Sequence, residues 1–304
     1  MASFSPHACH NPLLDQAPCR LAFSAERDFL PWRAALGEKL RELVGVMPDA
    51  VPLDLRVEAL REDAGVRETR FVFTAEAGAE VPAYLLTPAG DGPFPVVICL
   101  QGHTSGMHIS LGRALYDGDA AGIAGGRDFG VQAVREGYAA LVLEQRCFGE
   151  RRDDRPQAQR GFGAPTCLHA SMAALLLGRT MVGERVWDIS RAIDALAAFP
   201  QLDLRRIACM GNSGGGTISY YAACLDPRIS AVMPSCAVCT YRDSIGRIDH
   251  CADNYLPGVL NWAEMGDFAA LIAPRPLLIV AGREDPIFPL RAVEENFAHI
   301  HAIY

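Results

Sequence analysis

A serine set between glycines is the feature of this sequence best suited to chemistry. Residues 211–216 read Gly-Asn-Ser-Gly-Gly-Gly; they follow the apolar run 206–210, and a helical pattern begins at Thr217. This order of strand, Gly-x-Ser-x-Gly turn and helix predicts a nucleophile elbow, in which small neighbours let the backbone turn sharply and present the hydroxyl. We therefore expect Ser213 to be a nucleophile that needs a base, an orienting acid and donors for an oxyanion.

The donors for the oxyanion are expected on the backbone. One is the N–H of Gly214, the residue after the serine. The second is expected in the loop 101–106, Gln-Gly-His-Thr-Ser-Gly, which follows the apolar strand-like run 96–100. Within this loop we predict the N–H of His103. The alternative is that 101–106 is a plain glycine-containing connection between a strand and a helix.

Asp285 is the expected acid. It lies in the stretch 282–286, Gly-Arg-Glu-Asp-Pro, directly after the strand-like run 277–281. A carboxylate at this place would hold an imidazole in the required tautomer and stabilise its protonated form. Glu284 is the rival, but the prolines that follow indicate a tight turn around Asp285. A turn aspartate without a catalytic role is the alternative.

The histidine of such a catalytic triad is not found where it is expected. In this class of site the chain order is Ser, Asp, His, and only His299 and His301 follow Asp285. Both fall on the predicted helix 290–304, and at about 1.5 Å per residue they would lie roughly 14–16 Å from its start, far from the active edge. We therefore expect the catalytic histidine, with the last strand and helix of the fold, to lie beyond the end of this chain. Earlier histidines that stay open as bases are His103, His108, His169 and His250.

The pattern along the chain predicts an α/β fold. Strand-like runs at 69–74 and 81–87 form a hairpin, and from residue 96 strand-like and helical runs alternate. Alternation of this kind is typical of a mostly parallel central sheet with helices on both faces. The hairpin indicates that one edge of the sheet is antiparallel.

Two regions of the chain are expected. Residues 1–66, with an amphipathic helical pattern over 26–47, are predicted to be a helical extension packed on the core, and residues 67–304 the main domain. Long irregular stretches near 146–166 and 240–268 follow strand ends and are predicted to be lid-like loops over the site.

Composition limits the partners. The chain has 304 residues and a formal net charge of −8, which argues against nucleic acid or an anionic membrane as the main partner. It contains no apolar run of about 18 residues, and its first twenty residues lack the pattern of a signal peptide. We expect a cytoplasmic protein that acts on a small molecule. The amphipathic helix over 26–47 leaves a homo-oligomer open.

The ten cysteines are scattered and are expected to be reduced thiols. Cys236 and Cys239 have two-residue spacing, and His250-Cys251 follows, but a zinc site would want a second clean pair. We therefore predict no metal site, and no cofactor is implied.

Taken together, these motifs resemble the α/β-hydrolase superfamily, and within it the dienelactone hydrolase and acetyl xylan esterase-like branch. The resemblance covers residues 81–304 and rests on the stretches 100–103, 211–215 and 282–289. It implies an α/β-hydrolase fold and roles for Ser213 and Asp285. In such families the histidine lies in a loop after one further strand. The motifs are specific for the fold and weak for the substrate.

The leading hypothesis is a serine esterase that cleaves small carboxylic esters, such as acetylated sugars, through an acyl-enzyme. One alternative is a truncated or catalytically incompetent scaffold that keeps the hydrolase shape. Another is a peptidase, thioesterase or acyltransferase on the same fold, because the pocket rather than the triad sets the acyl and leaving groups.

Overall fold

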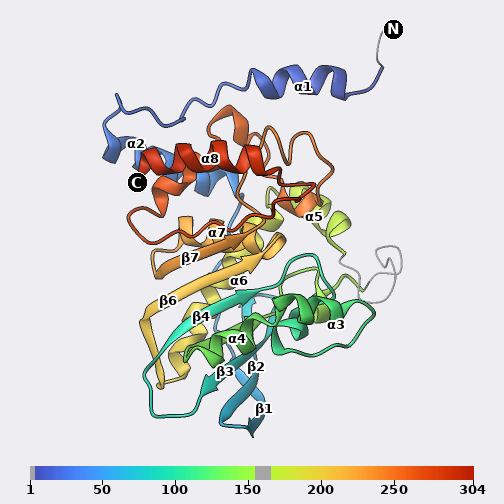
Figure 1. Cartoon of the computed structure of the whole chain (residues 1–304), viewed down its shortest axis with the longest axis vertical. Helices are drawn as coiled ribbons and strands as arrows, with labels where there is room; N and C mark the ends of the chain where they lie inside the picture. The colour runs from blue at the N-terminus through green and yellow to red at the C-terminus, as the bar shows by residue number, and fades with distance from the viewer. Residues whose placement is uncertain (1–3, 155–165) are drawn as a thin grey trace.

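A mixed β-sheet forms the centre of the protein. The computed structural model describes residues 4–154 and 166–304, and within them seven strands pair in the order β1-β2-β3-β5-β4-β6-β7 (Figure 1). Their bounds are β1 (Arg56–Asp63), β2 (Val66–Glu76), β3 (Ala79–Pro88), β4 (Phe94–Leu100), β5 (Ala139–Leu143), β6 (Leu202–Asn212) and β7 (Ile229–Ser235).

The sheet divides into an antiparallel and a parallel part. Strands β1, β2 and β3 form an antiparallel meander, and β3 is also antiparallel to β5. The strands β5, β4, β6 and β7 are all parallel. The antiparallel part is therefore larger than the predicted hairpin edge, while the alternation after residue 96 correctly predicts the parallel part.

The sheet begins before the predicted boundary between residues 66 and 67. β1 lies inside the segment 1–66 and pairs with β2 from Arg56 to Asp63. All eight residues of β1 are exposed. A strand that pairs through its backbone and buries neither face has no alternating apolar pattern, which is why the sequence does not show it.

Helices cover both faces of the sheet. They are α1 (His7–Asp15), α2 (Phe29–Leu43), α3 (Asp119–Gly122), α4 (Phe129–Arg135), α5 (Cys167–Leu176), α6 (Met181–Ala195), α7 (Gly214–Leu225) and α8 (Leu290–Ile303). Side chains alternate between the two faces: Ile98 joins the large core under α6 and α7, and the adjacent Cys99 joins a smaller cluster with Val134 of α4. Because successive side chains of a strand point to opposite faces of the sheet, neighbouring residues of β4 contribute to two separate cores.

The C-terminal helix packs near the start of the chain. In Figure 1, α8 and α2 lie at the same end of the molecule, with the end of the chain close by. Trp32 of α2 is buried, and its indole N–H donates to the Leu21 carbonyl at 2.8 Å. α2 and α8 both contact the 3₁₀ turn Met265–Leu271. α2 is therefore packed on the core, whereas α1 buries none of its residues.

The run 277–281 is predicted to be a strand, but in the structure it forms only isolated bridges. Leu277 and Val280 form isolated parallel bridges with Val232 and Ser235 of β7 rather than a continuous ladder. The segment lies along the outer edge of β7 in strand order. It delivers the turn with Asp285 to the same end of the sheet as β6 and β7.

The two predicted lids differ from simple loops. The segment 240–268 contains short 3₁₀ turns and buries Leu256, Met265 and Phe268 in the large core, so much of it is anchored. Of the stretch 146–166, residues 155–165 lie outside the described residues. No helix in the described ranges combines the length and hydropathy needed to cross a membrane.

Candidate active site

Ser213 stands at a sharp turn between β6 and α7. Its backbone has φ +53° and ψ −122°, while β6 ends at Asn212 and α7 begins at Gly214. A positive φ is rare for a residue with a side chain and persists where surrounding structure holds it. Here the N–H of Ser213 donates to the Ser235 carbonyl of β7 at 2.8 Å. The strand–turn–helix context predicted from the sequence is therefore present.

The glycines around Ser213 are needed for close backbone contacts. A Cβ on Gly211 would overlap the carbonyl of Gly215, and a Cβ on Gly215 would overlap the carbonyl of Leu100 at the end of β4. Real Cβ atoms do not approach other atoms so closely, so only glycine fits at these positions. The start of α7 thus lies directly against the end of β4.

The loop after β4 reaches the serine. A Cβ on Gly102 would lie 2.9 Å from the Cβ of Ser213 and 2.6 Å from the Asn212 carbonyl oxygen. The N–H groups of His103 and Gly214 donate to no acceptor among the described residues. The loop 101–106 and the elbow, far apart in the sequence, therefore come together.

The side chain of His103 is held in place by Asp253. The imidazole Nε2 lies 3.0 Å from each carboxylate oxygen of Asp253. The ring also packs edge-to-face with Phe148, at a centroid distance of 5.2 Å. Burial by itself would lower the pKa of His103, but the hydrogen bonds to Asp253 and Cys251 and the charge of Asp253 raise it to about 9.

Asp253 is paired on its other side with a buried arginine. The guanidinium of Arg185, on α6, donates to Asp253 Oδ2 at 2.6 Å, and both side chains are almost fully buried. The guanidinium also lies over the ring of Phe148, 4.4 Å from its centroid. Although burial opposes it, the charge of Arg185 is the main influence that holds the pKa of Asp253 far below its usual range. The chain His103–Asp253–Arg185 therefore ties the predicted oxyanion loop to α6.

Neither Asp253 nor Arg185 belongs to a motif that can be recognised in the sequence. Asp253 lies 150 residues from His103 along the chain, within the segment predicted to be a lid. Arg185 sits on α6, where a charged residue on an amphipathic helix ordinarily faces solvent. No local pattern links the three positions, since only the order of the strands brings them together.

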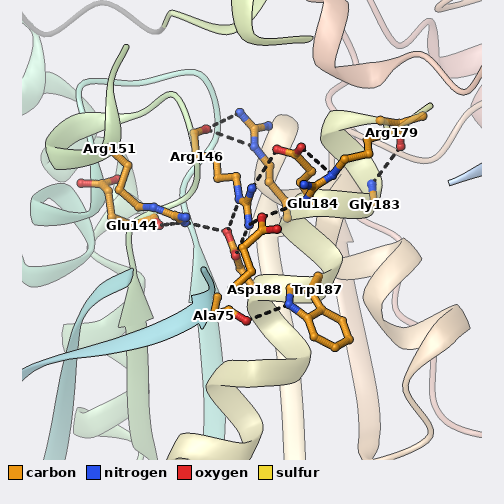
Figure 2. A network of polar contacts seen from close by, with 12 residues as sticks. Ala75, Glu144, Arg146, Arg151, Arg179, Gly183, Glu184, Trp187 and Asp188 are labelled. Atoms are coloured by element: carbon orange, nitrogen blue, oxygen red, sulfur yellow. Dashed lines mark hydrogen bonds and ion pairs between the residues drawn. The ribbon is translucent and has the colours of Figure 1, made fainter. Parts of the chain in front are cut away.

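Ionic contacts fix the loop after β5 to α6 (Figure 2). The Arg146 guanidinium binds both oxygens of Asp188 at 2.9 Å and also donates to Glu184 at 2.9 Å. Arg151 donates to Asp188 at 2.6 Å and to the Glu144 carbonyl at 3.1 Å. This network positions the segment 146–151, which includes Phe148 against the His103 ring.

The predicted acid sits in a tight turn. The Asp285 carboxylate accepts hydrogen bonds from the N–H groups of Ile287 and Phe288, each at 3.0 Å. The Asp285 carboxylate also contacts the thiol of Cys236. The backbone N–H of Cys236 donates to the Val280 carbonyl. Cys236 follows Ser235, the residue that holds the Ser213 N–H. Asp285 is therefore placed beside the end of β7, next to the strand that ends at the elbow.

The rival carboxylate differs from Asp285 in its exposure. Glu284 is exposed, while Asp285 is partly buried. The turn hydrogen bonds described above use Asp285 alone. This difference in exposure favours Asp285 over Glu284 as the candidate acid.

The histidines that follow Asp285 have other partners. His299 Nε2 lies 2.8 Å from the Asp267 carboxylate, which also accepts from the N–H of Phe23. His301 is exposed and stacks on Phe297. Both contacts agree with the expectation that these histidines pack or stabilise the helix rather than serve the site.

Two earlier histidines also form local contacts. His108 Nε2 lies 2.8 Å from Asp119, within a cluster that includes Ser105. His250 Nε2 lies 3.0 Å from the Ser244 hydroxyl and 3.1 Å from the Ile287 carbonyl oxygen, on the turn that holds Asp285. Burial lowers the pKa of His250. Of the two, His250 is nearer to the predicted acid.

A match to a sequence-family model shows the family to which this chain belongs. The family model described as acetyl xylan esterase (AXE1) matches residues 49–257, which contain His103, Ser213 and Asp253. This chain belongs to the acetyl xylan esterase family. As a member it is a carboxylic ester hydrolase with the α/β-hydrolase fold.

One curated protein and two solved structures illustrate what this family member is similar to. "Putative hydrolase YtaP" of Bacillus subtilis (strain 168) is 28% identical over 280 residues, covering 90% of this chain and 88% of the relative. A Bacteroides fragilis structure described as a "putative acetyl xylan esterase" has a TM-score of 0.76 at 18% identity, covering 99% of this chain and 81% of that chain. A glucuronoyl esterase from Solibacter usitatus has a TM-score of 0.65 at 17% identity, covering 94% and 84%. These structures support the α/β-hydrolase fold of the family member.

Proposed function

We propose that this protein hydrolyses carboxylic esters by attack of the Ser213 hydroxyl on the ester carbonyl, with an acyl-enzyme as intermediate. The observation that carries the proposal is the positive φ of Ser213 between β6 and α7. That conformation lifts the side chain out of the strand at the end of the parallel sheet, where α/β folds bind their ligands. Ser213 is partly exposed, as a nucleophile that meets substrate must be.

The oxyanion is assigned to the backbone N–H groups of Gly214 and His103. Both groups lie beside Ser213, and neither has an acceptor among the described residues. Donors that are already in place stabilise the negative charge that develops on the attacked carbonyl without a cost of reorganisation. The contact of the His103 ring with Asp253 fixes the side chain of the residue that supplies this N–H.

Asp285 is assigned the orienting role. Two backbone N–H groups fix its carboxylate. It can therefore hold the imidazole of a catalytic histidine in the tautomer that accepts the proton of the Ser213 hydroxyl. The imidazolium then returns the proton to the departing alcohol, and water releases the acid in a second attack. Membership of the acetyl xylan esterase family favours acetyl esters of saccharides as substrates.

Labelling with a fluorophosphonate probe tests the proposal. Peptide mapping should place the label on Ser213, and Ser213→Ala should lose both the label and the hydrolysis of p-nitrophenyl acetate. Ser219→Ala is the matched control, because the buried Ser219 hydroxyl on the same helix donates to the Gly216 carbonyl of its own helix. If the folded wild-type protein neither reacts with the probe nor hydrolyses esters, the hypothesis of a catalytically incompetent scaffold is supported instead.

Substrate class is tested on the same protein. Acetylated xylo-oligosaccharides and p-nitrophenyl acetate should be cleaved faster than aminoacyl amides or acyl thioesters. The reverse order would replace esterase by peptidase or thioesterase while leaving the role of Ser213 intact.

A further inference from the structure

Four metal-binding side chains gather beside the predicted oxyanion loop. Ligand atoms of His103, Cys167, Cys251 and Asp253 all lie within 4.8 Å of one another. His103 follows β4, Cys167 begins α5, and the other two lie in the segment after β7. Cys167 hydrogen-bonds to Cys251 and to a third thiol, Cys147. The fold therefore collects, from three distant parts of the chain, a set of donors that its sequence spacing conceals.

The kind and number of these donors match one metal best. Two thiolates, an imidazole and a carboxylate in tetrahedral arrangement are typical ligands of Zn²⁺, with Zn–S near 2.3 Å and Zn–N and Zn–O near 2.0–2.2 Å. Calcium and magnesium prefer sets made of oxygen atoms. Donor atoms within 4.8 Å of one another need only a small contraction to surround an ion at these distances. We propose that these four side chains form a closed, structural zinc site.

The charges of the site balance when zinc is bound. Two thiolates and the Asp253 carboxylate carry three negative charges, while Zn²⁺ and the buried guanidinium of Arg185 carry three positive charges. Arg185 is 1% exposed, contacts Asp253 at 2.6 Å and donates to the sulfur of Cys167 at 3.6 Å. Buried charges are tolerated when they are paired in this way. Binding requires each cysteine to release its thiol proton, and a ring nitrogen of His103 must present its lone pair.

The site is suited to structure rather than to catalysis. All four coordination positions come from the protein, and Cys167 and Asp253 are buried, so no position is left for water or substrate. Bound zinc would connect the loop after β4, the start of α5 and the segment after β7. It would hold the ring of His103, and with it the backbone N–H assigned to the oxyanion.

A disulfide is the competing use of these thiols. Cys167 contacts both Cys147 and Cys251, so oxidation could join it to either. A disulfide would make no use of the imidazole and the carboxylate that converge on the same point. The presence of His103 and Asp253 in the cluster favours the metal.

Metal analysis tests the proposal. Protein expressed with zinc and purified without chelators should contain about one zinc per chain. The variants Cys167→Ser and Cys251→Ser should lose it. Cys147→Ser is the matched control, because Cys147 lies beside the cluster without belonging to the four, and it should keep the metal. Chelation should lower the melting temperature of the wild type and of Cys147→Ser, and added Zn²⁺ should restore it.

Cobalt gives a readout that does not depend on the variants. Wild-type protein loaded with Co²⁺ should show visible bands of tetrahedral cobalt and a thiolate charge-transfer band. Wild type without bound zinc and without a thermal response to Zn²⁺ would overturn the proposal. So would equal zinc in Cys167→Ser, or a native disulfide at Cys167 found by mass spectrometry. Zinc bound by Ser213→Ala shows that the metal site stands even if the proposed ester hydrolysis fails.

Discussion

The imidazole of His103 lies directly over the Cα of Gly214. A Cβ built on Gly214 would meet Cε1 of the ring at 2.9 Å and Nδ1 at 3.0 Å. The ring cannot move away freely, because its Nε2 is held by both oxygens of Asp253. The two residues assigned to the oxyanion therefore determine each other's position.

The first prediction follows from this contact. Gly214→Ala should push the ring and the loop 101–106 outward and displace one oxyanion donor, which should lower kcat for p-nitrophenyl acetate about 10²-fold. Steady-state kinetics on folded protein measures the loss. Gly125→Ala, where a Cβ meets nothing within 4 Å, should leave kcat unchanged. Full activity of Gly214→Ala would contradict the assignment of these donors.

Asp285→Asn should remove the orienting charge without breaking the turn. The Asn oxygen can still accept from the N–H groups of Ile287 and Phe288, so thermal stability should change little. Turnover should fall by about 10⁴-fold, because the imidazole loses its required tautomer. Glu284→Gln is the control and should retain activity, since Glu284 is exposed. Equal losses in both variants would mean that Asp285 is an ordinary turn residue.

His299→Gln tests a structural role for this histidine by its pH dependence. The hydrogen bond to Asp267 raises the pKa of His299 above its usual value, although burial opposes this. The charged form thus stabilises the fold fully below about pH 6.5, and the contribution is lost as pH rises through the folded pKa. Urea denaturation should show a loss of about 1 kcal/mol at pH 6 that shrinks at high pH. His301→Gln is the control for loss of a histidine from the same helix, since its ring is exposed and stacks on Phe297.

Activity separates this role from catalysis. His299→Gln should keep the wild-type kcat at a temperature where it is folded. Loss of turnover without loss of stability would instead identify His299 as the general base.

Glu144 is expected to weaken the fold as pH rises. It is almost fully buried and accepts from the N–H of Met107 at 3.0 Å, yet burial raises its pKa from 4.5 to about 7. Between these values the folded state keeps a proton that the unfolded chain has released, so stability falls with rising pH by up to about 3 kcal/mol. Urea denaturation gives the free energy of unfolding at pH 5 and at pH 8. In Glu144→Gln the fall in this free energy between the two pH values should disappear. Exposed Glu136→Gln should retain it, and an unchanged slope in Glu144→Gln would show that Glu144 ionises normally.

The local features of this protein are determined by its sequence. The elbow at Ser213 depends on glycines within a few residues, and the turn at Asp285 depends on its own backbone N–H groups. Strand β5 has the predicted bounds, Ala139–Leu143, because a fully buried strand is a continuous apolar run. Signals of this kind act over a few residues and can be interpreted without knowing the fold.

Contacts between distant segments were decided only by the tertiary structure. Nothing near His103 in the sequence indicates that Asp253 and Arg185 will hold its ring, or that Cys167 and Cys251 will lie beside it. The sequence does not predict β1, because an exposed strand has no alternation of apolar and polar residues. These contacts depend on strand order and on which ends of parallel strands share an edge, and sequence spacing does not encode that proximity.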